Sequence, residues 1–354
     1  DIQNIRSAMN WAIRQGSDPA LGVPLAQSFA WFAYNTALAA EAADWCEAAL
    51  VALGPNPGLR EEADLQLGLA IARDFLRYGS ALIAPATQAA ALYRELDDKP
   101  QLAYALYYIC EAHLRMRRPL EGEAFADEGY AVALQAGDVR AQGRLQIAKA
   151  RTLEQRDPGE RVRLLTHAAA LFESIGDRHG VFSALIQLGE CLFEHGESAQ
   201  ALEKARECIA MLDENVETEQ HPLGVVLNNA AAYSIRLGRI DEAIQFAQRA
   251  LSVARRMSDR PLTAYALQYI AAVALAHGQA DRAARLFGAS NAFFDPSVAG
   301  RSWYTDRSSY ERSMTQLESL LPQSRIAQLM EDGARLRSDE AVSEARRVGS
   351  EARQ

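Results

Sequence analysis

The stretch Leu185–Cys208, LIQLGECLFEHGESAQALEKAREC, recurs in outline as LNNAAAYSIRLGRIDEAIQFAQRA (227–250) and LQYIAAVALAHGQADRAARLFGAS (267–290). Each copy opens on a leucine and carries a small residue four places later. Each copy also places a glycine eleven residues after its leucine, and these glycines are Gly196, Gly238 and Gly278. Internal repetition of this kind predicts a solenoid of stacked helical hairpins.

The small residues explain how such hairpins pack. Small side chains at matched places on two helices let their axes approach to roughly 8–10 Å. Glycine inside a helix costs about 0.5–1 kcal/mol relative to alanine, so Gly189 predicts a close contact between two helices. The pattern resembles the tetratricopeptide repeat, although the turn glycines lie 42 and 40 residues apart, against a repeat of roughly 34. We therefore expect an all-α, right-handed superhelix with longer helices or linkers than the minimal repeat.

Weaker hairpins are predicted before the clear repeats. They pair residues 21–35 with 38–53, 59–78 with 81–96, 101–117 with 119–135, and 139–156 with 158–175, which makes seven hairpins in all. Asp18-Pro19 and Asp157-Pro158 each provide a helix N-cap followed by a proline suited to the first helical position. The early repeats are degenerate, since Lys149 stands where the equivalent of Gly189 is expected. An acidic linker is predicted over 213–221, with Pro222 starting the next helix.

Four segments are expected along the chain. Residues 1–16 form a linking helix, 17–294 the repeat array, 295–348 a helical C-terminal cap, and 349–354 a frayed tail. Terminal units of solenoids depart from the repeat because they must cover an exposed apolar end. The predicted helices of the cap lie near 304–321, 324–336 and 339–348.

Composition excludes several classes of protein. The 354 residues are 49% hydrophobic and carry a formal net charge of −9, which argues against direct binding of nucleic acid or an anionic membrane. No apolar run approaches the roughly 18–20 residues of a membrane span. The four cysteines share no metal-type spacing and are expected to be reduced and buried. We expect a cytoplasmic protein.

The two ends of the chain resemble the large signal-transduction ATPases of the STAND type, many of which carry a winged-helix or LuxR-type DNA-binding module. The opening NIRSAMNWA (4–12) carries the resemblance, together with AARLFGA (283–289), YER (310–312), Gly333 and SDEAV (338–342). In that family the opening helix follows the ATPase and leads into a tetratricopeptide-like array. The resemblance implies upstream ATPase and DNA-binding modules in the same full-length chain. The loop 294–310 lacks the expected proline-rich character, so no ligand contact is carried over through it.

The sequence contains none of the catalytic or metal-binding motifs that we looked for. It contains no Gly-x-x-x-x-Gly-Lys-Ser/Thr phosphate loop and no His-Glu-x-x-His metal motif. Its six histidines are scattered, and Glu190 with Glu194 favours a solvated acidic face over an acid–base pair. We therefore expect no catalytic residue, no cofactor and no metal, and a chain that is not an enzyme by itself.

A ligand groove is predicted along the first helices of the hairpins. Two adjacent amides, Asn228 and Asn229, interrupt an otherwise apolar helix, where propensity disfavours them and burial requires partners. Because they point about 100° apart, we expect Asn228 to face the groove, at little cost to stability if replaced, and Asn229 to face a neighbouring helix. Glu190 and the side chains of Gln146, Gln187, Gln268 and Tyr265 are the other predicted groove residues.

The resemblance implies the sensor or effector arm of an ATPase-linked transcriptional regulator. A protein, a peptide or a small-molecule inducer would sit in the groove and shift the array between curvatures, and self-association stays open. The alternative from another class is a free-standing scaffold that gathers peptide segments of partner proteins. A quorum-type peptide receptor also uses such arrays, but no DNA-binding helix-turn-helix is present to support it.

Overall fold

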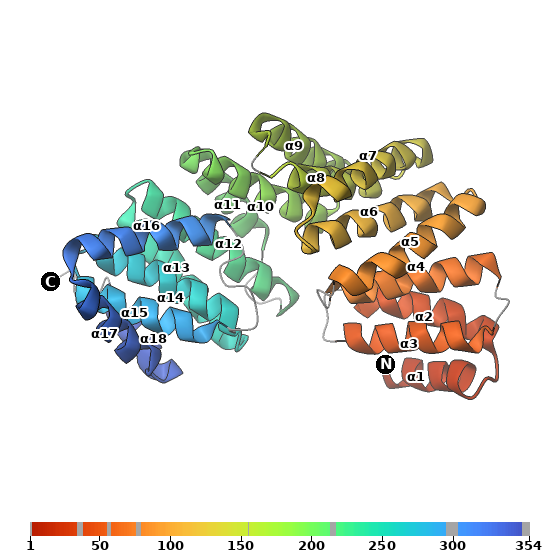
Figure 1. Cartoon of the computed structure of the whole chain (residues 1–354), viewed down its shortest axis with the longest axis horizontal. Helices are drawn as coiled ribbons and strands as arrows, with labels where there is room; N and C mark the ends of the chain where they lie inside the picture. The colour runs from red at the N-terminus through yellow and green to blue at the C-terminus, as the bar shows by residue number, and fades with distance from the viewer. Residues whose placement is uncertain are drawn as a thin grey trace. The chain divides into compact units, whose positions relative to one another are not determined.

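The computed structural model describes residues 2–33, 38–54, 58–75, 79–154, 156–212, 217–294 and 304–348 (Figure 1). Within these ranges the chain forms α-helices and one π-helical turn, without a strand. The predicted all-α fold is confirmed.

The helices, in chain order, are α1 Ile2–Met9, the π-helical turn η1 Asn10–Arg14, α2 Pro19–Ala33, α3 Ala39–Ala52, α4 Leu59–Phe75, α5 Gly79–Glu95, α6 Lys99–Arg115, α7 Pro119–Ala136, α8 Val139–Thr152, α9 Pro158–Ser174, α10 Arg178–Glu194, α11 Ser198–Met211, α12 Glu217–Arg236, α13 Ile240–Arg256, α14 Arg260–Ala276, α15 Ala280–Phe293, α16 Tyr304–Leu320, α17 Gln323–Ala334 and α18 Ser338–Arg347. In the described residues, α2 to α15 form seven consecutive hairpins, the number predicted.

The hairpin turns use the predicted glycines. Gly196, Gly238 and Gly278 have φ values of +86°, +72° and +76°, a conformation that glycine adopts without a Cβ penalty. In the first of these turns the Glu197 amide donates to the Leu192 carbonyl over 2.8 Å, which closes the helix end as a Schellman motif does. The glycine positions therefore mark the ends of the first helices.

Aspartates begin several helices as predicted. The Asp18 carboxylate accepts from the Leu21 amide over 3.1 Å, and the Asp157 carboxylate accepts from the Glu160 amide over 2.9 Å. Such caps satisfy backbone donors that the first turn of a helix leaves unpaired. The predicted start at Pro222 is wrong, because α12 begins at Glu217 and carries this proline in its second turn.

The chain divides into two compact units, Asp1–Val181 (unit 1) and Phe182–Gln354 (unit 2), with the division inside α10. In unit 1 the first helical segment belongs to the core. Met9 and Ile13 are buried in one cluster with Phe29 and Trp45.

Unit 1 also holds an aromatic ring that packs closely against two glycines. The Phe172 side chain on α9 is 1% exposed, and a Cβ on Gly143 would lie 2.6 Å from its Cζ atom. A Cβ on Gly180 would overlap the Phe172 Cδ1 atom. Only glycine therefore fits at these two places on α8 and α10 while the ring keeps its position.

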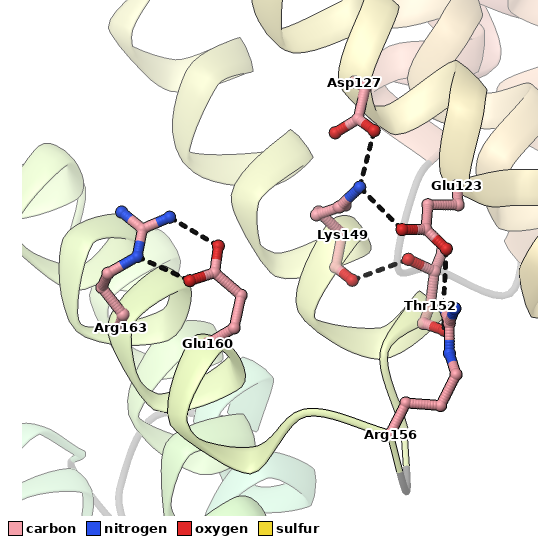
Figure 2. A network of polar contacts seen from close by, with 7 residues as sticks. All are labelled: Glu123, Asp127, Lys149, Thr152, Arg156, Glu160 and Arg163. Carbon is pink, nitrogen blue, oxygen red and sulfur yellow. Dashed lines mark hydrogen bonds and ion pairs between the residues drawn. The ribbon is translucent and has the colours of Figure 1, made fainter.

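Lys149 shows how a degenerate repeat is held together. Its Nζ atom donates to Glu123 Oε1 over 3.0 Å and to Asp127 Oδ2 over 2.6 Å, both on α7 (Figure 2). Arg156, in the following turn, donates to the other Glu123 oxygen over 2.6 Å. Where the clear repeats use a small residue, this hairpin uses an ion-pair network.

In unit 2, Gly189 lies where α10 meets α11 and α12, but at ordinary van der Waals distances that an alanine would also accept. A Cβ there would lie 3.6 Å from the Ala201 carbonyl oxygen on α11 and 3.4 Å from the Tyr233 hydroxyl on α12. The crossing of α15 and α17, by contrast, requires glycine. A Cβ on Gly288 would overlap the Met330 carbonyl, and one on Gly333 would overlap a backbone carbonyl of α15.

Across the described ranges, no helix is both long enough and apolar enough to span a membrane. The four cysteines are free and buried, as expected from their apolar helical faces.

Candidate functional site

The candidate site lies on the first-helix face of unit 2, which we define as the face of α10, α12 and α14 that contacts α16. These three are the first helices of consecutive hairpins, and α16 packs against α12 and α14. The first turn of α16 is deeply buried there, with Thr305 0% exposed and Asp306 5% exposed. Two polar residues at a helix start are therefore withdrawn from solvent.

Glu190 of α10 holds the start of α16. The Thr305 hydroxyl donates to Glu190 Oε2 over 2.6 Å, and the Thr305 backbone amide also bonds to this carboxyl group. The first backbone amides of a helix have no partner within the helix, and the N-terminus attracts acceptors and negative charge. Glu190 acts as a capping group supplied from another hairpin.

Two neighbouring residues of α14 hold Asp306. The Gln268 Nε2 atom donates to the Asp306 backbone carbonyl over 2.9 Å. The Tyr269 hydroxyl donates to the Asp306 carboxylate. The site thus recognises three chemical features of one short segment: a hydroxyl, a backbone carbonyl and a carboxylate.

Burial changes the chemistry of Glu190. Burial, and secondarily the charge of Asp306, raise the pKa of Glu190 to about 8. At neutral pH this carboxyl group is therefore mostly protonated, which lets it lie close to a second acid. The expected solvated acidic face is wrong for Glu190, which is 7% exposed, because α16 covers it.

Burial of Asn228 does not fit the surface-like position expected of a groove residue. Asn228 is 3% exposed and Asn229 7% exposed, so both amides of α12 are buried. Among the described residues, neither the oxygen nor the nitrogen of the Asn228 amide has a hydrogen-bond partner. A buried amide without partners costs about 1–3 kcal/mol, which marks it as a position whose residue type packing alone does not explain.

The other predicted groove residues do not all join this site. Gln187 on α10 is half-buried. Tyr265 on α14 is half-buried too, with its ring edge-on to Phe294 at 5.1 Å between centroids. Gln146 lies on α8 in unit 1, where its side-chain oxygen is buried without a partner. Of the six predicted residues, Glu190 and Gln268 share contacts with the start of α16.

Sequence reasoning missed Thr305, Asp306 and Tyr269. Thr305 and Asp306 read as an ordinary polar start of a terminal helix, and Tyr269 as an apolar core residue. The contact between Glu190 and Thr305 joins residues 115 positions apart. No local pattern carries such a pairing.

A cavity of about 440 Å³ elsewhere in unit 2 is a weaker candidate. Its lining includes Arg255, which pairs with Asp339 over 3.1 Å. It also includes Arg260, whose guanidinium lies over the Phe293 ring and donates to the Ala292 carbonyl over 3.2 Å. Both cations are thus already engaged within the chain.

Comparison with known proteins relates the fold to the tetratricopeptide repeat. The profile of the Tetratricopeptide repeat family matches residues 223–290, which run through α12 to α15. The chain contains a tetratricopeptide-like domain. No curated protein matches the chain in sequence.

Solved structures extend the likeness beyond those residues. The apo form of the quorum sensor NprR from B. thuringiensis is 12% identical with a TM-score of 0.57, over 93% of this chain and 95% of that one. NprR in complex with its cognate peptide NprX gives 12% and 0.57, over 94% and 98%. The apo form of RapI gives 10% and 0.57, over 84% and 98%. At these identities the likeness concerns the tetratricopeptide-like fold.

Proposed function

We propose that this chain is a peptide-binding interaction module and the sensor or effector arm of an ATPase-linked transcriptional regulator. The first-helix face of unit 2 is the binding face. The module is not an enzyme by itself, and catalysis in the assembly belongs to an upstream ATPase. Residues 1–16 link the two, ahead of the repeat array over 17–294 and the cap over 295–348.

One observation carries the peptide-binding role. Gln268, Tyr269 and Glu190 already hold a hydroxyl, a backbone carbonyl and a carboxylate of one short polypeptide segment. A face that holds one such segment from polar groups of two hairpins has the chemistry to hold another. The NprR structure named for its complex with a cognate peptide, NprX, shows that a similar fold accepts a peptide.

The regulator context rests on the resemblance of the two chain ends. A bound peptide transmits a signal only if it binds one state of the array better than another. The sequence of the full gene separates the two candidates: a P-loop encoded upstream supports the regulator, and a start codon near Asp1 supports the free-standing scaffold.

Random peptides displayed on phage and selected on the full chain test the binding role. We expect enriched peptides whose affinity falls about five- to ten-fold in Asn228→Ala, since one lost hydrogen bond is worth about 1 kcal/mol or more and this amide has no partner among the described residues. Gln200→Ala is the matched control, because Gln200 is an exposed amide on α11. Selection that yields no peptide, or peptides insensitive to Asn228→Ala, contradicts the proposal.

A further inference from the structure

One position recurs along the first helices. Gln146, Asn228 and Gln268 each directly follow the leucine of the repeat pattern (Leu145, Leu227 and Leu267), at the position that Ile186 takes in α10. They are therefore equivalent residues of the repeat. At this position Gln268 binds a backbone carbonyl, whereas the Asn228 amide is buried with neither atom bonded among the described residues.

Two amides at one repeat position therefore differ: Gln268 is hydrogen-bonded to the start of α16, and Asn228 is not. The α16 turn takes the hydrogen-bonding capacity of Gln268 and Glu190 and leaves that of Asn228 unused. An amide at this repeat position suits a polypeptide backbone, which offers both a donor and an acceptor. A ligand longer than the α16 turn would engage both amides.

We infer that Thr305–Asp306 is a built-in ligand of the first-helix face, and that the external partner is a peptide that displaces it by presenting a hydroxyl residue followed by a carboxylate residue. The inference rests on the proposed peptide-binding function. It names the chemistry that the partner must carry, and it makes that partner a competitor of α16.

The competition follows from the contacts. Glu190, Gln268 and Tyr269 can serve one hydroxyl–carboxylate segment at a time, because each is already bonded to Thr305 or Asp306. The partner must therefore bind more tightly than the internal turn at its effective concentration. Its contacts with Asn228 supply the advantage. When it binds, the first turn of α16 leaves this face.

A copy of the internal ligand provides the probe. We would label a synthetic peptide with the sequence of residues 304–314, YTDRSSYERSM, and titrate it with the full chain by fluorescence anisotropy. The Asp306→Ala chain should bind this peptide at least about ten-fold more tightly than the wild type, because its own turn competes less well. Asp332→Ala, which removes an exposed acid from α17, is the matched control and should behave as the wild type does.

The chemistry of recognition is tested on the peptide itself. A peptide carrying Thr305→Val and Asp306→Ala should lose binding to the Asp306→Ala chain by about ten-fold or more. Equal affinity of the parent peptide for the wild type and for Asp306→Ala overturns the inference, as does absence of binding to a folded Asp306→Ala chain.

A second measurement uses the wild-type chain, so it does not depend on the folding of a variant. In the wild type, saturating peptide should increase amide hydrogen exchange in the first turn of α16 and leave α15 unchanged. Unchanged exchange in α16 with peptide bound overturns the inference.

The phage-selected peptides distinguish the two proposals. If they bind the wild type and Asp306→Ala equally, the built-in ligand is wrong and the peptide-binding function stands. If none is selected while the 304–314 peptide binds as expected, the function fails and the internal recognition stands.

Discussion

The Glu190 carboxyl group couples protonation to the docking of α16. It lies among Thr305, Asp306, Glu194 and Tyr233, and burial is the first cause of its raised pKa. Two acids can share this site because one of them keeps its proton. The protonation state of a single residue therefore bears on whether the helix start stays in place.

The stability of unit 2 should fall as pH rises. The pKa of Glu190 is about 8 in the fold, above its ordinary value of 4.5, so the folded state binds more protons between these values. The contribution is fully present below about pH 4.5 and is lost as pH rises through about 8, with a slope of up to about 1.4 kcal/mol per pH unit. Urea melts of the wild type and Glu190→Gln across this range check it.

In Glu190→Gln this part of the slope should disappear, because glutamine does not titrate. Glu203→Gln, at an exposed acid of α11, is the control and should keep the wild-type slope. A slope of the same size in Glu190→Gln and the wild type would show that another group carries it.

Replacing Asn228 with an apolar residue should stabilise the fold and weaken peptide binding. Because its amide is buried and unbonded among the described residues, an apolar side chain of similar size removes a desolvation cost and loses no hydrogen bond within the fold. Asn228→Leu should therefore raise the free energy of unfolding by about 1 kcal/mol, as measured by urea denaturation. A loss of more than about 1 kcal/mol would mean that the amide has a structural role.

Among the elements, the crossing of α15 and α17 depends on two glycines without side chains. Gly288 and Gly333 lie where the backbones approach so closely that a Cβ on either would overlap a carbonyl of the other helix. The resemblance marked both positions, and the structure supplies their physical reason. Close backbone approach is the reason for glycine inside these two helices.

Alanine at Gly333 should force α15 and α17 apart. We expect Gly333→Ala to lower the free energy of unfolding by about 1–3 kcal/mol, the range for overpacked contacts. The matched control is Gly159→Ala in the first turn of α9, where a Cβ would meet one atom at 3.8 Å, and it should stay within about 0.5 kcal/mol of the wild type. Equal effects in thermal melts of the two variants would contradict the close crossing.

The elements were largely predictable because their signals are local. Asp157 and its proline fix the start of α9, and glycines such as Gly196 fix the ends of first helices. The candidate site was predictable only in part. Glu190 and Gln268 stand at recurring places on first helices, but the partners Thr305 and Asp306 come from a terminal helix without repeat periodicity. That pairing depends on tertiary packing.

At the scale of the whole molecule, the two compact units contain the same kind of helical repeat, but different contacts hold the repeats of each unit together. Unit 1 holds the ion-pair network of Lys149 and the two glycines against Phe172, and unit 2 holds the glycine crossing of α15 and α17 and the buried polar contact with α16. Their common repeat position gives Gln146 in one unit and Asn228 in the other.

The full chain should not bind ATP. Its sequence contains no glycine-rich phosphate loop with a following lysine, which an ATP site of the P-loop type requires. Calorimetric titration with ATP and Mg²⁺ at micromolar protein should give heats of dilution alone. Saturable binding would contradict the assignment of nucleotide chemistry to an upstream module.

The affinity of the Asn228→Leu chain for a phage-selected peptide is the decisive quantity for the first-helix face. If this face binds the peptide backbone through its unbonded amide, Asn228→Leu should weaken binding by about ten-fold while the chain remains as stable as the wild type or more so. Titration calorimetry on the two chains gives the comparison directly. Unchanged affinity in the folded Asn228→Leu chain would contradict peptide binding through Asn228 on the first-helix face of unit 2.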